Sequence, residues 1–127
     1  MLYIVDNIIF LIGRVLFGGF FIMNGFNHFT KIKMMSGYAA SKGVPMAGFM
    51  VALTGIMLFL GGLGIALGEY IAIALILIAV FLLVVSVKMH NFWAIQDPNQ
   101  RMNEMINFTK NIALLGAVLM MLALFLF

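Results

Sequence analysis

The chain has no cysteine and very little charge. Without cysteine there can be no disulfide, no thiol redox chemistry and no cysteine-ligated iron–sulfur or zinc centre. Charged residues make up only 9% of the 127 positions, whereas a soluble domain carries about 25%. Hydrophobic residues reach 65%, and the mean hydropathy is +1.20. A chain of this size could not bury so much apolar surface in water, so we expect lipid to be its solvent.

Motifs for familiar soluble chemistry are also missing. No Walker motif, nucleophile elbow, paired carboxylates or His-Glu-x-x-His sequence occurs, so hydrolytic and ATP-driven functions are not expected. The net charge of +3 does not indicate nucleic-acid binding, because the seven Lys and Arg residues lie mostly at the boundaries of hydrophobic segments and form no basic stripe. The first apolar segment lacks the basic start of a signal peptide and is expected to be retained.

Four apolar segments are long enough to cross a bilayer, which needs ~20 residues, or ~17 at the short end. They cover about residues 8–26, 46–67, 70–87 and 108–127. Backbone groups in lipid must pair within their own segment, and these segments lack the alternation of a barrel strand, so each is predicted to be a helix. The expected fold is all-α, a polytopic membrane four-helix bundle that forms a single transmembrane domain over residues 1–127.

Two connections carry turn signals. Gly68 and Glu69 leave so short a link between the second and third segments that a tight antiparallel hairpin is expected, with Gly68 in the left-handed conformation that ends a helix. Asp97, Pro98 and Gln100 match a helix N-cap, a first-turn proline and a capping-box partner. The fourth helix is therefore expected to begin near residue 98, outside the bilayer, and to enter lipid near residue 108.

The distribution of Lys and Arg predicts the orientation. Two connections, one between the first and second segments and one between the third and fourth, hold Lys31, Lys33, Lys42, Lys88 and Arg101, and Lys110 lies at the end of the second connection. Both connections lie on the same side of a four-span protein. The positive-inside rule then places these basic loops in the cytoplasm and both termini outside a cell membrane.

Small residues recur at helical spacing on the first two segments. Helices associate in lipid largely through close backbone packing, so glycine stripes indicate contact faces. Six glycines are candidates for helix packing: Gly18, Gly25, Gly55, Gly62, Gly64 and Gly68. The first four are expected to face the bundle interior. Gly64 and Gly68 form a separate GxxxG pair, which is expected to be an exposed docking face for another subunit.

Arg14 lies inside the first apolar segment. A buried arginine costs at least ~2.5 kcal/mol on insertion scales, so it needs a partner or a role. Asp6 and Glu69 are the candidate partners, because both lie on the same predicted side. One interpretation is a structural salt bridge with the side chain reaching the outer headgroups. The other is a contact with an anion or a quinone carbonyl inside the bundle.

Polar side chains gather where the first and third segments meet the basic loops. A quinone headgroup needs hydrogen-bond partners beside apolar contacts for its tail, and this rim could provide them. The candidate quinone-binding residues are Asn24, His28, His90 and Trp93. An ordinary wetted interface with aromatic anchors would use the same residues. His28 and His90 lack a spaced second ligand such as His-x-x-x-His, so we assign no metal site.

The chain resembles the DoxX family of small four-span membrane proteins. The resemblance rests on short motifs along nearly the whole chain: Arg14, Gly18, Phe21, Gly25 and Lys31; Gly61, Gly62 and Gly68; His90, Phe92 and Trp93; Lys110, Asn111, Ala113 and Gly116. Many members carry a glutamate just before the paired glycines, where this chain has Leu58. The family is similar to membrane subunits of an archaeal thiosulfate:quinone oxidoreductase, and other relatives are linked to redox homeostasis.

Three functions follow as hypotheses. The first is a non-catalytic accessory or scaffold subunit of a larger, possibly redox, membrane complex, with the bilayer and other membrane subunits as partners. The second is a quinone-interacting membrane subunit of an oxidoreductase, for which quinone is the candidate cofactor. The third is a small-solute transporter, for which a lining of charged residues is expected and only Arg14 qualifies. In the first two, the chain has no catalytic activity of its own.

Overall fold

The computed structural model describes residues 2–126, with side chains from Ile4 onward. Five α-helices and one 3₁₀ turn follow one another: α1 (Leu2–Thr30), α2 (Ile32–Ser41), α3 (Ala47–Leu67), α4 (Ile71–Lys88), η1 (Phe92–Ala94) and α5 (Pro98–Leu126). No strand occurs among these residues. The helices α1, α3, α4 and α5 are long and apolar enough to cross a membrane. The prediction of an all-α membrane helix bundle is confirmed.

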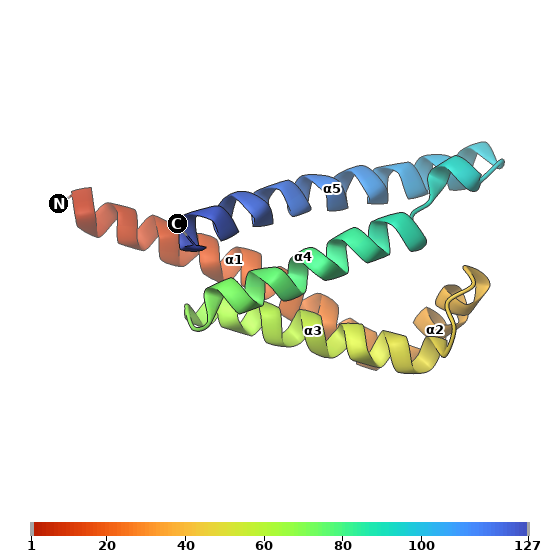
Figure 1. Ribbon diagram of the computed structural model, residues 1–127, viewed down its shortest axis with the longest axis horizontal. Coiled ribbons are helices and arrows are strands. Elements are labelled where there is room, and N and C mark those ends of the chain that lie inside the picture. Colours follow the sequence, from red (N-terminus) through yellow and green to blue (C-terminus); the bar gives the residue numbers. More distant parts are fainter. Residues whose placement is uncertain (1, 127) are drawn as a thin grey trace.

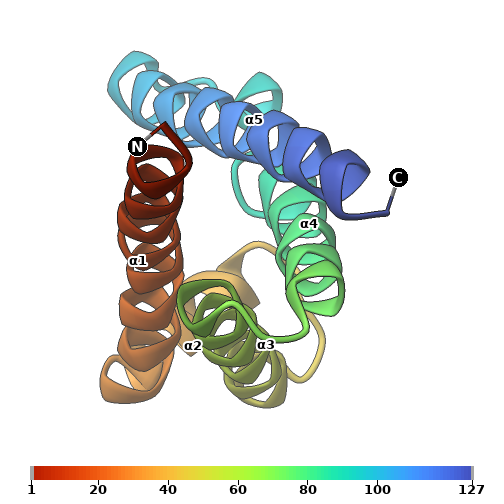
Figure 2. The same ribbon diagram turned by 90° about the vertical axis from the view of Figure 1, so that its left-hand side faces the viewer.

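The long helices are arranged as an open row. Each of α1, α3, α4 and α5 packs against the next, and the row bends so that α1 and α5 face each other without packing along their lengths (Figures 1 and 2). Near the beginning of α1 and the end of α5, the rings of Phe10 and Phe125 approach to 6.1 Å between centroids. The bundle therefore keeps a gap on the side where its first and last helices meet.

The two ends of the bundle differ in composition. One end, here called the basic end, holds α2 and the connection from α4 to α5, with Lys31, Lys33, Lys42, Lys88 and Arg101. The other end, here called the terminal end, holds the beginning of α1, the turn from α3 to α4 and the end of α5 (Figure 1).

The backbones of α1 and α3 lie unusually close together. A Cβ added to Gly18 would lie 2.5 Å from the carbonyl oxygen of Gly62, and one added to Gly25 would lie 2.7 Å from that of Gly55. Such contacts let two helices pack without large side chains between them. Leu58 is fully buried in the apolar core. It stands where many members of the family that the chain resembles carry a glutamate. This close pairing fixes which face of α1 turns toward α4 and α5.

The turn between α3 and α4 uses Gly68 in the left-handed conformation, with φ +75°. The N–H of Glu69 donates to the carbonyl of Gly64 at 2.9 Å, as in a glycine-terminated helix. A Cβ on Gly64 would lie 2.9 Å from the carbonyl oxygen of Glu69 and 3.0 Å from Cβ of Ala74. The expectation that Gly64 and Gly68 are an exposed docking face is therefore wrong, because the hairpin itself covers Gly64 and Arg14 covers Gly68.

The connection between α1 and α3, expected to be a loop, contains the short helix α2. Lys31 leaves the helical conformation, with φ −117° and ψ 31°, and so separates α1 from α2. Ala39 of α2 is buried, and α2 packs against α3. Hydropathy alone does not reveal α2, because its ten residues are too few and too polar to cross a bilayer.

The start of α5 is held by a side-chain cap. Asp97 Oδ2 accepts a hydrogen bond from the N–H of Gln100 at 3.0 Å, and Pro98 is the first helical residue. The preceding 3₁₀ turn packs its aromatic rings on α5, with Trp93 5.5 Å from Phe108 between centroids. These contacts set the rotation of α5 about its axis, and with it the residues of α5 that face the bundle.

Candidate functional site

A cavity of about 390 Å³ lies within the bundle toward the basic end. Side chains from all five α-helices line it, and most of them are apolar, among them Phe21, Val51, Met57, Phe81 and Leu82. The lining also includes several polar residues: Asn24, His28, Tyr38, Lys88, His90, Lys110 and Asn111. An apolar cavity of this volume with a few converging polar groups is typical of a small-molecule site.

His28 and Asn24 bring two of these polar groups from α1. His28 Nδ1 lies 2.8 Å from the backbone carbonyl of Asn24. Because a carbonyl oxygen can only accept, the hydrogen of a neutral His28 ring lies on Nδ1 and the lone pair on Nε2. Asn24 Nδ2 donates to the carbonyl of Phe20 at 2.8 Å. Both side chains are thus oriented by their own helix, and His28 is buried, with its ring 6.0 Å from that of Phe81.

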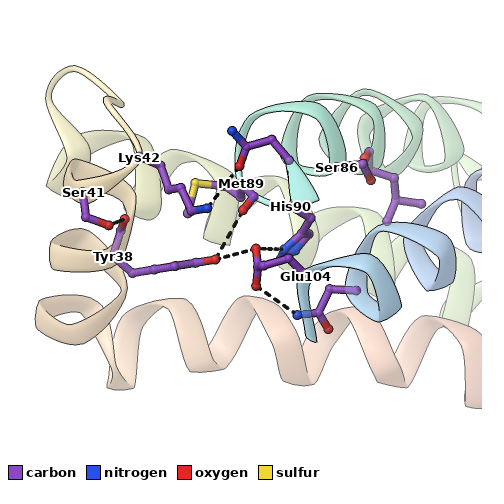
Figure 3. A network of polar contacts seen from close by, with 10 residues as sticks. Tyr38, Ser41, Lys42, Ser86, Met89, His90 and Glu104 are labelled. Carbon is purple, nitrogen blue, oxygen red and sulfur yellow. Dashed lines mark hydrogen bonds and ion pairs between the residues drawn. The ribbon is translucent and has the colours of Figure 1, made fainter. Parts of the chain in front are cut away.

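His90 belongs to a network centred on the carboxylate of Glu104 (Figure 3). Glu104 Oε2 lies 3.1 Å from His90 Nδ1 and accepts a hydrogen bond from the Tyr38 hydroxyl at 2.7 Å. Glu104 Oε1 accepts a longer hydrogen bond from Asn107 Nδ2 at 3.5 Å. Burial, followed by the hydrogen bond to Glu104, raises the pKa of Tyr38 well above its ordinary value. The network joins α2, the α4–α5 connection and α5.

Lysine side chains surround the same end of the cavity. Lys42 Nζ donates to Asn91 Oδ1 at 3.1 Å and lies 5.8 Å from the centre of the Tyr38 ring. Lys88 Nζ reaches the α2–α3 connection, where it would lie 3.6 Å from a Cβ on Gly43. Within the described residues, neither Lys88 nor Lys110 forms an ion pair. Both lysines belong to the lining but are exposed, and neither ammonium group has a carboxylate partner among the described residues.

Three of the four residues predicted to bind quinone lie together, and the fourth does not. Asn24, His28 and His90 line the same cavity, whereas Trp93 lies outside the lining and packs against Phe92 and Phe108. The expectation for Trp93 therefore needs correction, because its ring is part of the aromatic cluster that holds η1 on α5. No group of three or more His, Cys, Asp or Glu that could hold a metal ion occurs in the part of the chain that the structure describes.

Sequence reasoning missed Tyr38, Glu104, Lys110 and Asn111 as members of the site. For Tyr38 no signal is visible, because its partner Glu104 lies 66 residues further along the chain. A signal for α5 does exist. Glu104, Asn107 and Asn111 recur at steps of three and four, which places them on one face of a helix. The cap at Asp97 sets where that helix begins.

Arg14 lies at the terminal end and takes no part in the cavity. Its guanidinium packs against the turn at Gly68, with Cζ 3.0 Å from the position of an added Cβ, and 5.3 Å from the centre of the Phe10 ring. No ion pair links it to Asp6 or Glu69, so the prediction of these partners is wrong. The carbonyl end of α3 attracts a cation instead. Arg14 Nε is buried without a hydrogen-bond partner within the described chain.

Comparison with known proteins identifies one family. The family model described as DoxX matches residues 9–91, which is more than half of the chain and runs from α1 through α4 to Asn91. Glu104 and Asn111 lie beyond the matched residues. No curated protein and no solved structure matches the chain.

Proposed function

The chain belongs to the DoxX family, and on that premise we propose that it is a membrane subunit that binds a quinone-class amphiphile in its cavity. The observation that carries this proposal is that Asn24, His28 and His90 line one mostly apolar cavity. A quinone headgroup is a flat ring with oxygen atoms at its edge, and it combines apolar contacts with a few hydrogen bonds. The cavity volume of about 390 Å³ suits a ring of that size.

A route from the lipid supports the same ligand class. A second cavity of about 380 Å³ lies between α1 and α5, lined by Gly13, Leu16, Phe17, Phe20, Lys110 and Leu114. Phe20 and Lys110 belong to both linings. Because α1 and α5 do not pack along their lengths, an apolar tail can extend from the first cavity through the second into the bilayer. A water-soluble ligand would have no need of such an opening.

The proposed subunit works in a cell membrane with its basic end in the cytoplasm. The positive-inside rule supports this orientation, because Lys and Arg apart from Arg14 and Lys110 lie at that end. The headgroup would then bind near the cytoplasmic surface, where a partner protein can reach it. The chain has no cysteine, so a partner would supply any thiol-bound redox centre and the electrons for quinone chemistry.

Two other functions receive less support. The scaffold role relied on Gly64 and Gly68 as an exposed docking face, and both glycines are covered by other parts of the chain. A transport function rested on Arg14, which packs at the turn of the terminal end and not in the cavity. The proposed quinone-binding subunit is therefore also an accessory subunit, because it acts together with a partner protein.

Calorimetric titration of the protein in lipid nanodiscs tests the proposal. The probes are a benzoquinone with a decyl tail and its reduced form. We expect saturable binding of at least one probe, weakened about two- to tenfold in Asn24→Leu and in His28→Leu, since each change removes a hydrogen-bonding group worth roughly 0.5–1.5 kcal/mol. Asn27→Leu is the matched control, because Asn27 lies on the same helix but outside the cavity lining.

The same titration also gives the results that would contradict the proposal. Binding that persists at full strength in both Asn24→Leu and His28→Leu would remove the cavity as the site. Absence of saturable binding of either probe to the unaltered protein would refute the proposed function. Melting temperatures of the unliganded variants, measured in the same nanodiscs, distinguish a lost contact from a lost fold.

A further inference from the structure

We propose that the cavity prefers the reduced, hydroxyl-bearing form of its ligand, and that His90, positioned by Glu104, accepts the hydrogen bond from a ligand hydroxyl. This inference rests on the proposed function and adds to it the chemical state of the ligand. Its basis is the hydrogen-bonding capacity that remains unused in the cavity lining.

The two histidines have already used their Nδ1 atoms. His28 Nδ1 donates to the carbonyl of Asn24, and His90 Nδ1 faces the carboxylate of Glu104 at 3.1 Å. The same carboxylate oxygen accepts the Tyr38 hydroxyl, so Glu104 acts as an acceptor and the hydrogen of the His90 contact lies on Nδ1. In a neutral ring Nε2 then carries a lone pair. Neither Nε2 atom has a hydrogen-bond partner among the described residues.

The remaining donors come from other residues of the lining. Lys88 and Lys110 have ammonium groups without a carboxylate partner in the described chain, and Asn24 uses only one of its two amide hydrogens. The cavity thus offers lone pairs from histidine together with an N–H donor from Asn24, and the two exposed lysines belong to its lining. A carbonyl oxygen can satisfy only the donors. A hydroxyl group donates and accepts, so it satisfies both kinds of group.

Of the two histidines, the observations favour His90 as the one that accepts the hydrogen bond from the ligand hydroxyl. Only His90 has a carboxylate on its Nδ1 side, and a carboxylate there holds the ring in one tautomer, which leaves the lone pair of the neutral ring on Nε2. Glu104 is itself held by Tyr38 and Asn107, from α2 and α5. Glu104 is therefore a positioning residue that acts on the ligand through His90 (Figure 3).

The experiment compares three decyl-tailed probes by calorimetry in nanodiscs, under anaerobic conditions: the hydroquinone, its dimethyl ether and the quinone. The ether keeps the ring, tail and oxygens but cannot donate a hydrogen bond. We expect the unaltered protein to bind the hydroquinone at least tenfold more tightly than the ether, since a site built for a hydroxyl rejects an analogue without one. In His90→Phe this ratio falls to about one, while affinity for the ether is retained.

Variants of Glu104 separate positioning from folding. Glu104→Gln removes the charge and can donate to Nδ1, which moves the hydrogen to Nε2, so the ratio of the two affinities should fall several-fold. Glu104→Asp keeps a carboxylate and should retain more of the ratio than Glu104→Gln. Asn27→Leu is again the control, because Asn27 lies outside the lining, and it should leave the ratio unchanged.

The outcomes distinguish the two proposals. If hydroquinone, ether and quinone bind equally, or if His90→Phe keeps the preference for hydroquinone, the inference about the hydroxyl is overturned and the proposed function stands. If none of the three probes binds, the proposed function fails, and the inference fails with it. A ratio that depends on His90 and on the charge of residue 104 supports both.

Discussion

At the scale of single residues, the contact between α1 and α3 depends on the absence of side chains. An added Cβ at Gly62 would lie 2.5 Å from the carbonyl oxygen of Gly18 and 2.7 Å from the backbone nitrogen of Ile22. Backbone atoms cannot move aside as a flexible side chain can. The two helices would have to separate, and that separation would also disturb the positions of Asn24 and His28 at the cavity.

We therefore expect Gly62→Ala to destabilise the protein by roughly 1–3 kcal/mol, the usual cost of overpacking. Gly116→Ala is the matched control, since a Cβ on Gly116 meets nothing within 4 Å. Alanine favours a helix over glycine by up to ~1 kcal/mol, so the control should be neutral or slightly stabilising. Denaturation of both variants in mixed micelles measures the difference, and equal stability would contradict this account of the α1–α3 contact.

At the scale of elements, α2 is attached to the rest of the basic end mainly by polar contacts. The Tyr38 hydroxyl donates to Glu104 at 2.7 Å and lies 3.3 Å from the carbonyl of Met89. A hydrogen bond to a charged group contributes about 1.5–3 kcal/mol. The helix is only ten residues long, too short to be stable alone in water. Its order therefore depends on this attachment and on packing against α3.

Tyr38→Phe should loosen α2 while leaving the four long helices intact. The ring and its contact with Lys42 remain, and only the hydroxyl is lost. Amide hydrogen exchange, measured by mass spectrometry, should increase about tenfold or more over residues 32–41 and change little in α3. Ser41→Ala is the control, because its hydroxyl donates only to the local carbonyl of Tyr38. Unchanged exchange in the Tyr38→Phe variant would mean that α3 alone holds α2.

At the scale of the whole molecule, the unequal distribution of charge predicts how the protein lies in its membrane. The basic end and the terminal end are separated by the length of the bundle (Figure 1). The chain has no cysteine, so a single introduced cysteine reports on one position. Glu69 lies in the exposed turn of the terminal end, and Ser41 lies in the exposed end of α2 at the basic end.

We expect Glu69→Cys to react with a membrane-impermeant maleimide on intact cells, and Ser41→Cys to react only after the cells are permeabilised. The reason is that positively charged loops are retained in the cytoplasm. The unaltered chain, which has no thiol, serves as the blank. The opposite labelling pattern would invert the proposed orientation and place the headgroup end of the cavity outside.

Hydropathy and local spacing were sufficient to predict a lipid environment and an all-helical fold. Long apolar segments force their backbone groups to pair internally, so α1, α3, α4 and α5 follow from hydropathy. Short motifs between Arg14 and His90 also carry the family resemblance, which the family model bears out over residues 9–91. The start of α5 is equally local, because Asp97 caps the helix with its own side chain. Interactions over a few residues can be read from spacing alone.

The contacts of the polar residues follow from how the helices pack, and local spacing in the sequence does not encode them. Arg14 had two acidic candidates in the sequence, yet it packs against the carbonyl end of α3, because helix rotation brings Gly68 to it. Tyr38 and Glu104 meet across 66 residues, a contact that no periodicity encodes. The cavity depends in the same way on the gap between α1 and α5. Hydropathy specifies that a helix crosses the bilayer, whereas the packing of small residues and caps specifies which face it turns inward.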